Sequence, residues 1–264
     1  MTLKFSPRRF WRTLVWTLNY QWRTLLTLFT AAVTVFALFQ CFGCIQGRNN
    51  ISYHLLSGHS IEIIIASTLE QIGSVGLAVG ACLLCVGASI AFRHLHSQNE
   101  GRRLLMLPAS PLEKFLARWI LYVPMLFVLL VVAFMVGDVL RVLIWPLFGY
   151  DVSFPSAIPA FFTLLKYLFF ITPANQPLAI IIIWAMFLFF HALSLFCSVY
   201  VRRMAWLFVL VAFFVVTGLI LNGSNKATEL HVWEFVVPAV VLAVGSYWLF
   251  CRYPQYQLFH HKID

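Results

Sequence analysis

The chain has 264 residues, of which 62% are hydrophobic and only 10% are charged, and its mean hydropathy is +0.89. Soluble globular domains are typically ~45–50% apolar and ~25% charged, so this composition excludes that class and predicts an integral membrane protein. The formal net charge of +9 would suggest nucleic acid as the partner of a soluble protein, but in a membrane protein it indicates basic anchoring residues, and no nucleic-acid partner is expected.

Uninterrupted apolar runs of membrane-spanning length favour helices over the ten-residue alternating strands of a barrel. We therefore predict an all-α integral membrane protein that forms a single transmembrane domain over residues 1–264. No signal peptide is expected, because Arg12 and Arg23 interrupt the first apolar stretch. The six predicted transmembrane helices cover about residues 24–42, 72–92, 119–139, 178–201, 204–221 and 232–251.

Residues 1–23 combine basic residues with apolar side chains that recur on one helical face. This pattern predicts an interfacial helix on the cytoplasmic side of the membrane, with an ordinary basic leader as the alternative. The apolar residues are Trp11, Leu14, Val15, Leu18 and Trp22.

After the first span, the polar residues from Gly47 to about Ser60 predict an external connection. Residues 61–71 are expected to form a short outer segment, and Glu70 and Gln71 mark its junction with the second span. Gly76 and Gly80 form a G-x-x-x-G pair there, which would let another helix approach closely or, alternatively, contribute to a pore.

Six cysteines include two C-x-x-C pairs, Cys41–Cys44 and Cys82–Cys85. Such pairs can bind zinc, but zinc ligands normally lie on hydrophilic loops, whereas both pairs lie at or within predicted spans. No metal site is therefore expected. A disulfide between Cys41 and Cys44 at the outer membrane face is an open alternative.

Residues 93–114 interrupt the apolar pattern between spans two and three and form a basic cytoplasmic segment. Ser110, Pro111 and Glu113 have the spacing of a capping box, which predicts that a helix starts at Ser110. Upstream, Glu100 to Leu107 can form a short amphipathic helix with Arg102 and Arg103 toward water.

Asp138 and Arg141 share a helical face at the end of span three and predict an ion pair at the outer boundary. The following connection, Trp145 to Gln176, is the longest external segment and contains several prolines. Its apolar middle, Phe161 to Ile171, is too short to cross a membrane. It either lies in the outer interface or dips into the membrane and returns.

The positive-inside rule supports this topology. Of the 18 lysines and arginines, all lie on the predicted inner side except Arg48, Arg141, Lys166 and Lys226. Both termini are therefore expected in the cytoplasm.

Two stripes of polar residues are predicted to point into the helix bundle. They could form a path for a transported molecule or simply make hydrogen bonds between helices. His191 could also respond to pH, or be a neutral, hydrogen-bonded side chain. The candidate cargo-path residues are Thr27, Thr30 and Thr34, which follow Thr24 in the first span, and His191, Ser194 and Ser198 in the fourth.

The chain lacks the phosphate-binding G-x-x-x-x-G-K-[ST] loop, H-E-x-x-H and G-x-S-x-G. We expect neither an enzyme nor a cofactor bound by this chain, so any energy source must be external.

Leu105 to Trp119 reads LMLPASPLEKFLARW. This stretch resembles the LPAS-x-x-EKF segment of bacterial ABC transporter permease subunits of the exporter (type 2) class. The resemblance implies an inner-membrane permease that pairs with a second permease copy or paralogue and couples to an ATPase subunit that binds ATP and Mg²⁺. The apolar walls of the spans suit a hydrophobic or amphipathic cargo such as a lipid, peptide or drug. The coupling residues would be Asn99, Glu100, Gly101, Arg102, Arg103, Leu104, Leu105, Met106 and Leu107.

Two alternatives remain. A non-transporting membrane scaffold or assembly factor would use the same basic segment to bind anionic lipid. An intramembrane lipid enzyme would require polar residues to cluster around His191 and Glu70.

Overall fold

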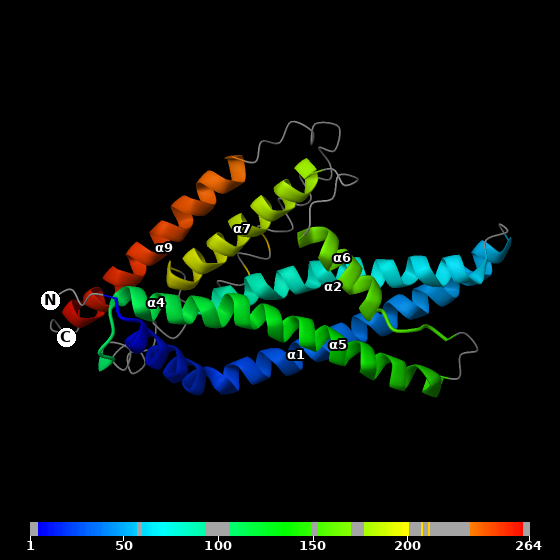
Figure 1. Ribbon diagram of the computed structural model, residues 1–264, viewed down its shortest axis with the longest axis horizontal. Coiled ribbons are helices and arrows are strands. Elements are labelled where there is room, and N and C mark those ends of the chain that lie inside the picture. Colours follow the sequence, from blue (N-terminus) through cyan, green and yellow to red (C-terminus); the bar gives the residue numbers. More distant parts are fainter. Residues whose placement is uncertain are drawn as a thin grey trace. The chain divides into compact units, whose positions relative to one another are not determined.

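The computed structural model describes residues 5–56, 60–92, 106–148, 153–169, 177–200, 207, 211 and 233–260. The regular secondary structure of this part is entirely helical, without a strand (Figure 1). The elements in order are α1 (Pro7–Leu56), α2 (Ile61–Ile90), α4 (Pro111–Ile120), the π-helix η2 (Leu121–Met125), α5 (Leu126–Ile144), the 3-10 helix η3 (Trp145–Phe148), α6 (Ile158–Phe169), α7 (Pro177–Tyr200) and α9 (Trp233–His260).

Four helical runs in the described part are long and apolar enough to cross a membrane: Pro7–Ile51, Ile61–Ile90, Pro111–Phe148 and Phe235–Arg252. They correspond to the first, second, third and sixth predicted spans. Helix α7 covers the fourth, although its fully described apolar part, Ile183–Val199, is shorter. The fifth predicted span, 204–221, lies outside the described residues except Leu207 and Val211.

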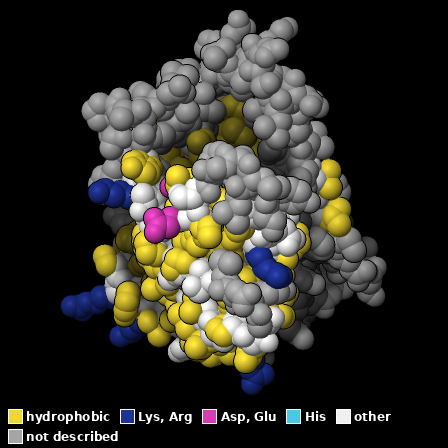
Figure 2. Space-filling model, turned by 90° about the vertical axis from the view of Figure 1, so that its right-hand side faces the viewer, with side chains coloured by type: hydrophobic (Ala, Val, Ile, Leu, Met, Phe, Trp, Pro, Cys, Tyr) yellow, Lys and Arg dark blue, Asp and Glu magenta, His cyan; other side chains and the backbone are white. Residues whose placement is uncertain are grey.

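Hydrophobic side chains dominate the described surface in the view of Figure 2, with only scattered charged groups. Large apolar residues such as Leu38, Val128 and Leu147 are exposed. In water such a surface would favour aggregation, whereas hydrocarbon solvates it. The exposed surface therefore agrees with a membrane protein, as the composition predicts.

The chain divides into two compact units. Unit 1 contains residues 1–23, 84–126 and 176–264, and unit 2 contains residues 24–83 and 127–175. The division within α1 falls between Arg23 and Thr24, where the sequence predicts the change from interfacial helix to first span.

In unit 1, α7 packs along α9, and α9 also contacts α4. An aromatic cluster joins Phe92, Phe115 and Phe250, with ring centroids 5.2–5.5 Å apart. The backbone amide of Phe92 donates to Ser198 Oγ at 2.9 Å, which ties the chain after α2 to α7.

In unit 2, Phe134 of α5 lies at the centre of the packing. Its ring contacts Phe36 of α1 edge-on, with centroids 5.5 Å apart, and stacks on Phe161 of α6 at 4.1 Å. A Cβ atom on Gly76 would lie only 2.5 Å from the Phe134 ring, so glycine permits this approach of α2 to α5. The predicted role of Gly76 in close helix packing is confirmed.

Three predicted helix breaks are absent. Helix α1 continues past Arg23 and through the predicted connection at Gly47, and α2 continues through Glu70 and Gln71. A Cβ atom on Gly47 would lie only 2.5 Å from Thr68 Cγ2, so this glycine permits close packing and does not end the helix. Glu70 and Gln71 are exposed on α2, where both residue types favour a helix.

The third predicted span is longer than expected and contains a π-helix. The helical run starts at Pro111 and continues to Phe148, well beyond Val139. Pro124 lies inside η2. Proline lacks an amide hydrogen and its ring clashes with the carbonyl four residues earlier, and a π-helical turn accommodates both changes.

Candidate functional site

The predicted coupling segment lies mostly outside the described residues. The structure describes only Met106 and Leu107 of this segment, and Asn99 to Leu105 lie outside the described residues. The Met106 side chain is 80% exposed shortly before the start of α4. An apolar side chain in this position is available to a partner or to lipid.

The structure contains the helix start that the sequence predicts. Ser110 is the N-cap of α4, and Pro111 occupies the first turn. The Glu113 amide donates to Ser110 Oγ at 3.2 Å, and the Ser110 amide donates to Glu113 Oε2 at 2.8 Å. The two bonds form the capping box and hold the first turn in one geometry.

The other Glu113 oxygen binds the beginning of the chain. Its Oε1 accepts a hydrogen bond from the Ser6 amide at 2.6 Å and one from Arg9 Nη2 at 3.4 Å. Glu113 is fully buried, whereas the Arg9 side chain is 32% exposed. We call Ser6, Arg9, Ser110 and Glu113 the cap junction, because Glu113 joins the starts of α1 and α4.

The sequence did not predict the link to Ser6 and Arg9. Capping boxes are local patterns, whereas Ser6 and Glu113 are 107 positions apart. The available signal was an acidic residue at the start of α4 and a basic N-terminal segment, and such charges have many possible partners.

Residues 7–23 of α1 bury their polar face rather than their apolar one. Thr13, Thr17 and Gln21 are almost fully buried, while Trp11 and Trp22 are more than half exposed. Exposed tryptophans on a basic helix are typical of a membrane interface. The finding fits the predicted interfacial face.

The threonine stripe does not point into the interior as predicted. Thr27, Thr30 and Thr34 are exposed on α1. Thr30 Oγ1 donates to the Thr27 carbonyl and Thr34 Oγ1 to the Thr30 carbonyl, each at 3.0 Å. A threonine can satisfy its hydroxyl on its own helix, so it needs no partner helix. The use of this stripe by a cargo stays a prediction.

The α7 stripe is buried, as predicted. Ser194 Oγ donates to the Phe190 carbonyl at 2.6 Å, and Ser198 accepts from Phe92. The His191 ring stacks on Phe187 with centroids 6.0 Å apart. Both His191 ring nitrogens are buried without a hydrogen-bond partner among the described residues. The two predicted stripes belong to different units.

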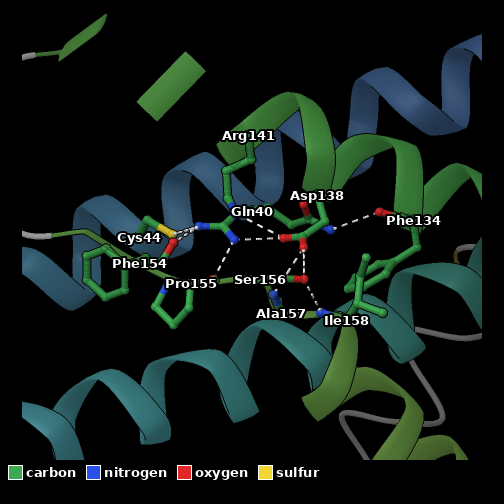
Figure 3. Close-up of polar contacts among 10 residues, drawn as sticks. All are labelled: Gln40, Cys44, Phe134, Asp138, Arg141, Phe154, Pro155, Ser156, Ala157 and Ile158. Atoms are coloured by element: carbon green, nitrogen blue, oxygen red, sulfur yellow. Dashed lines mark hydrogen bonds and ion pairs between the residues drawn. The ribbon is translucent and has the colours of Figure 1, made fainter. Parts of the chain in front are cut away.

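The most complete polar site is an ion pair in unit 2 (Figure 3). Arg141 donates to Asp138 Oδ1 from Nε at 3.0 Å and from Nη2 at 2.8 Å, and both side chains are buried. The predicted ion pair is therefore present. Its burial is unexpected for a boundary pair, because an exposed boundary would leave both groups in water.

Both partners also bind the chain before α6. Asp138 Oδ2 accepts from Ser156 Oγ at 2.6 Å and from the Ala157 amide at 3.1 Å. Arg141 donates to the carbonyls of Phe154 at 3.2 Å and Pro155 at 2.7 Å. We call residues 153–157 the strap, and these bonds the anchor network.

The anchor network also reaches α1, where Arg141 Nη1 lies 3.2 Å from Cys44 Sγ. One network thus joins α1, α5 and the strap. The sequence indicated little about which residues would join the anchor network. Ser156 stands between two prolines before α6, but nothing in that pattern identifies Asp138 as the acceptor of the Ser156 hydroxyl.

All six cysteines are free thiols, so the structure has no Cys41–Cys44 disulfide. Among the residues that the structure describes, no three His, Cys, Asp or Glu side chains are grouped to hold a metal ion. Cys44 instead contacts Arg141.

Comparison of the chain with protein-family models, curated proteins and solved structures found no match. The geometry itself defines the class: an all-helical chain, throughout its described part, with several apolar helices long enough to cross a membrane.

Proposed function

We propose that this protein is the membrane-spanning permease subunit of an ATP-driven exporter in the bacterial inner membrane, with both termini cytoplasmic. It would pair with a second permease copy or paralogue and move a hydrophobic or amphipathic cargo. ATP and Mg²⁺ would bind to a separate ATPase subunit. Two features support the proposal: the resemblance of Leu105–Trp119 to permease subunits and the geometry of the cap junction.

The cap junction is the observation that carries the proposal. A movement imposed on residues 99–107 reaches the membrane only if the following helix starts rigidly. Ser110 and Glu113 provide two reciprocal hydrogen bonds at this start, and Glu113 also holds the Ser6 amide. A helix fixed in this way can transmit force as a lever.

The proposed cycle starts when ATP closes two ATPase subunits and carries the coupling segment with them. Arg102 and Arg103 bind acidic ATPase side chains, and Leu104 and Leu105 fill an apolar groove. The capped α4 then transmits the displacement into the third span.

The test is charge reversal of the coupling arginines. In Arg102→Glu/Arg103→Glu, the acidic partner groups would be repelled, so an ATPase subunit bearing a phosphate-binding loop should no longer co-purify in mild detergent. The matched control is Arg202→Glu/Arg203→Glu, which reverses a second basic pair on the predicted cytoplasmic side.

Equal co-purification of the ATPase subunit with the coupling variant and the control would contradict the docking site. If the unmodified chain recovers no ATP-binding subunit, and ATP drives no transport in reconstituted vesicles, the scaffold function replaces the permease function.

A further inference from the structure

Helix α6 is too short to cross a membrane. It has 12 residues and therefore a length of about 18 Å, against an apolar thickness of about 30 Å. The sequence allows it either to lie in the interface or to dip into the membrane. The contacts of α6 within unit 2 distinguish these positions.

Helix α6 lies along the middle of its neighbours. The Phe161 ring stacks on Phe134, and the Phe169 ring lies 6.3 Å from Phe127, both on α5. A Cβ on Gly73 of α2 would lie 3.2 Å from the Phe161 amide nitrogen, so the α6 backbone approaches α2 closely. Figure 1 shows α6 beside these helices.

The order of these contacts gives α6 a direction. Its beginning lies near Asp138, its first turn near Phe134 and its last turn near Phe127. It thus runs antiparallel to α5, from the level of Asp138 to that of Phe127, near the middle of the apolar run Pro111–Phe148. A helix confined to the interface would meet only the end of that run.

The strap is irregular backbone at the level of Asp138 and Arg141. In hydrocarbon, each backbone polar group without a partner is strongly unfavourable, so such a segment is tolerated only where protein satisfies it. Arg141 binds the carbonyls of Phe154 and Pro155, and Asp138 binds the Ala157 amide. The buried ion pair therefore supplies the partners that water cannot.

We propose that the strap and α6 form a membrane-dipping element, which enters from the outer face and ends near the middle of the membrane. Asp138 and Arg141 are positioning residues that hold this element at depth. The inference does not depend on the transport function, because it rests only on contacts within unit 2.

The test measures membrane depth in reconstituted vesicles of the full chain. A fluorescent amino acid is placed singly at Tyr167 of α6, at Val128 in the middle of the apolar run Pro111–Phe148 and at Leu147 at its outer end, all of them exposed. Lipids carrying a nitroxide near the headgroup or deep in the acyl chain quench each probe. Tyr167 should show the deep profile of Val128, and the shallow profile of Leu147 would overturn the proposal.

The anchor is tested with the same probes. Asp138→Asn and the milder Ser156→Ala should each shift the Tyr167 probe toward shallow quenching while the Val128 probe stays deep. Ser74→Ala is the matched control, because the Ser74 hydroxyl donates to the Gln71 carbonyl of its own helix. If Asp138→Asn does not fold, Ser156→Ala decides. A Tyr167 probe unmoved by either anchor substitution would overturn the positioning role.

Discussion

The amide of Ser6 donates a hydrogen bond of 2.6 Å to Oε1 of Glu113, a residue 107 positions later in the chain. This bond makes Glu113 more than a local cap: it couples the start of α1 to the start of α4. The buried carboxylate has both oxygens occupied, which leads to the first prediction.

Replacing Glu113 with Gln should lower the free energy of unfolding by about 1–3 kcal/mol, because an amide cannot accept on both sides and leaves a buried group unpaired. Ser110→Ala should cost about 1 kcal/mol, the usual effect of losing an N-cap. Thermal unfolding in detergent measures both. A Glu113→Gln loss no larger than that of Ser110→Ala would show that the contact with Ser6 adds nothing.

Arg141→Met should destabilise the protein by about 3–5 kcal/mol, since it leaves the Asp138 carboxylate buried without its charge partner. The double variant Asp138→Leu/Arg141→Met should lose less than the two single losses combined, because it leaves no unpaired charge. Lys166→Met is the control, as that side chain is exposed on neighbouring α6. Additive losses would contradict a coupled pair.

Gly76→Ala should destabilise the protein by about 1–3 kcal/mol through overpacking, because the new Cβ would meet the Phe134 ring at 2.5 Å. Gly80→Ala offers a matched comparison on the same helix, where the nearest atom is 4.0 Å away, on Phe36. It should be neutral or slightly stabilising, since alanine favours a helix. Similar unfolding temperatures for both variants would refute the proposed close packing at Gly76.

His191→Phe should raise the unfolding temperature. The imidazole nitrogens are buried with no partner within the described structure, and a phenyl ring would keep the stacking on Phe187 without that penalty of about 1–3 kcal/mol. Ser194→Ala, which removes a bond to its own helix, serves as the reference. A large fall in stability for His191→Phe would reveal a polar partner and return His191 to the candidate cargo path.

Local patterns predicted much of the secondary structure. Apolar runs predicted the helices, and the spacing of Ser110, Pro111 and Glu113 predicted the start of α4. They failed at Gly47, where a residue typical of turns continues a helix. A glycine ends a helix or permits close packing depending on its neighbour in space, and that neighbour, Thr68, is remote in sequence.

The sequence alone thus determined the membrane class, the positions of most apolar helices, the cap at Ser110 and the pairing of Asp138 with Arg141, because each depends on composition or on spacing within one helix. Only the tertiary structure decided that Glu113 binds Ser6 and that Asp138 and Arg141 hold the strap. These are contacts between distant segments. A buried charged group pairs with the polar groups that the fold brings next to it, and helical periodicity does not indicate which distant residues those will be.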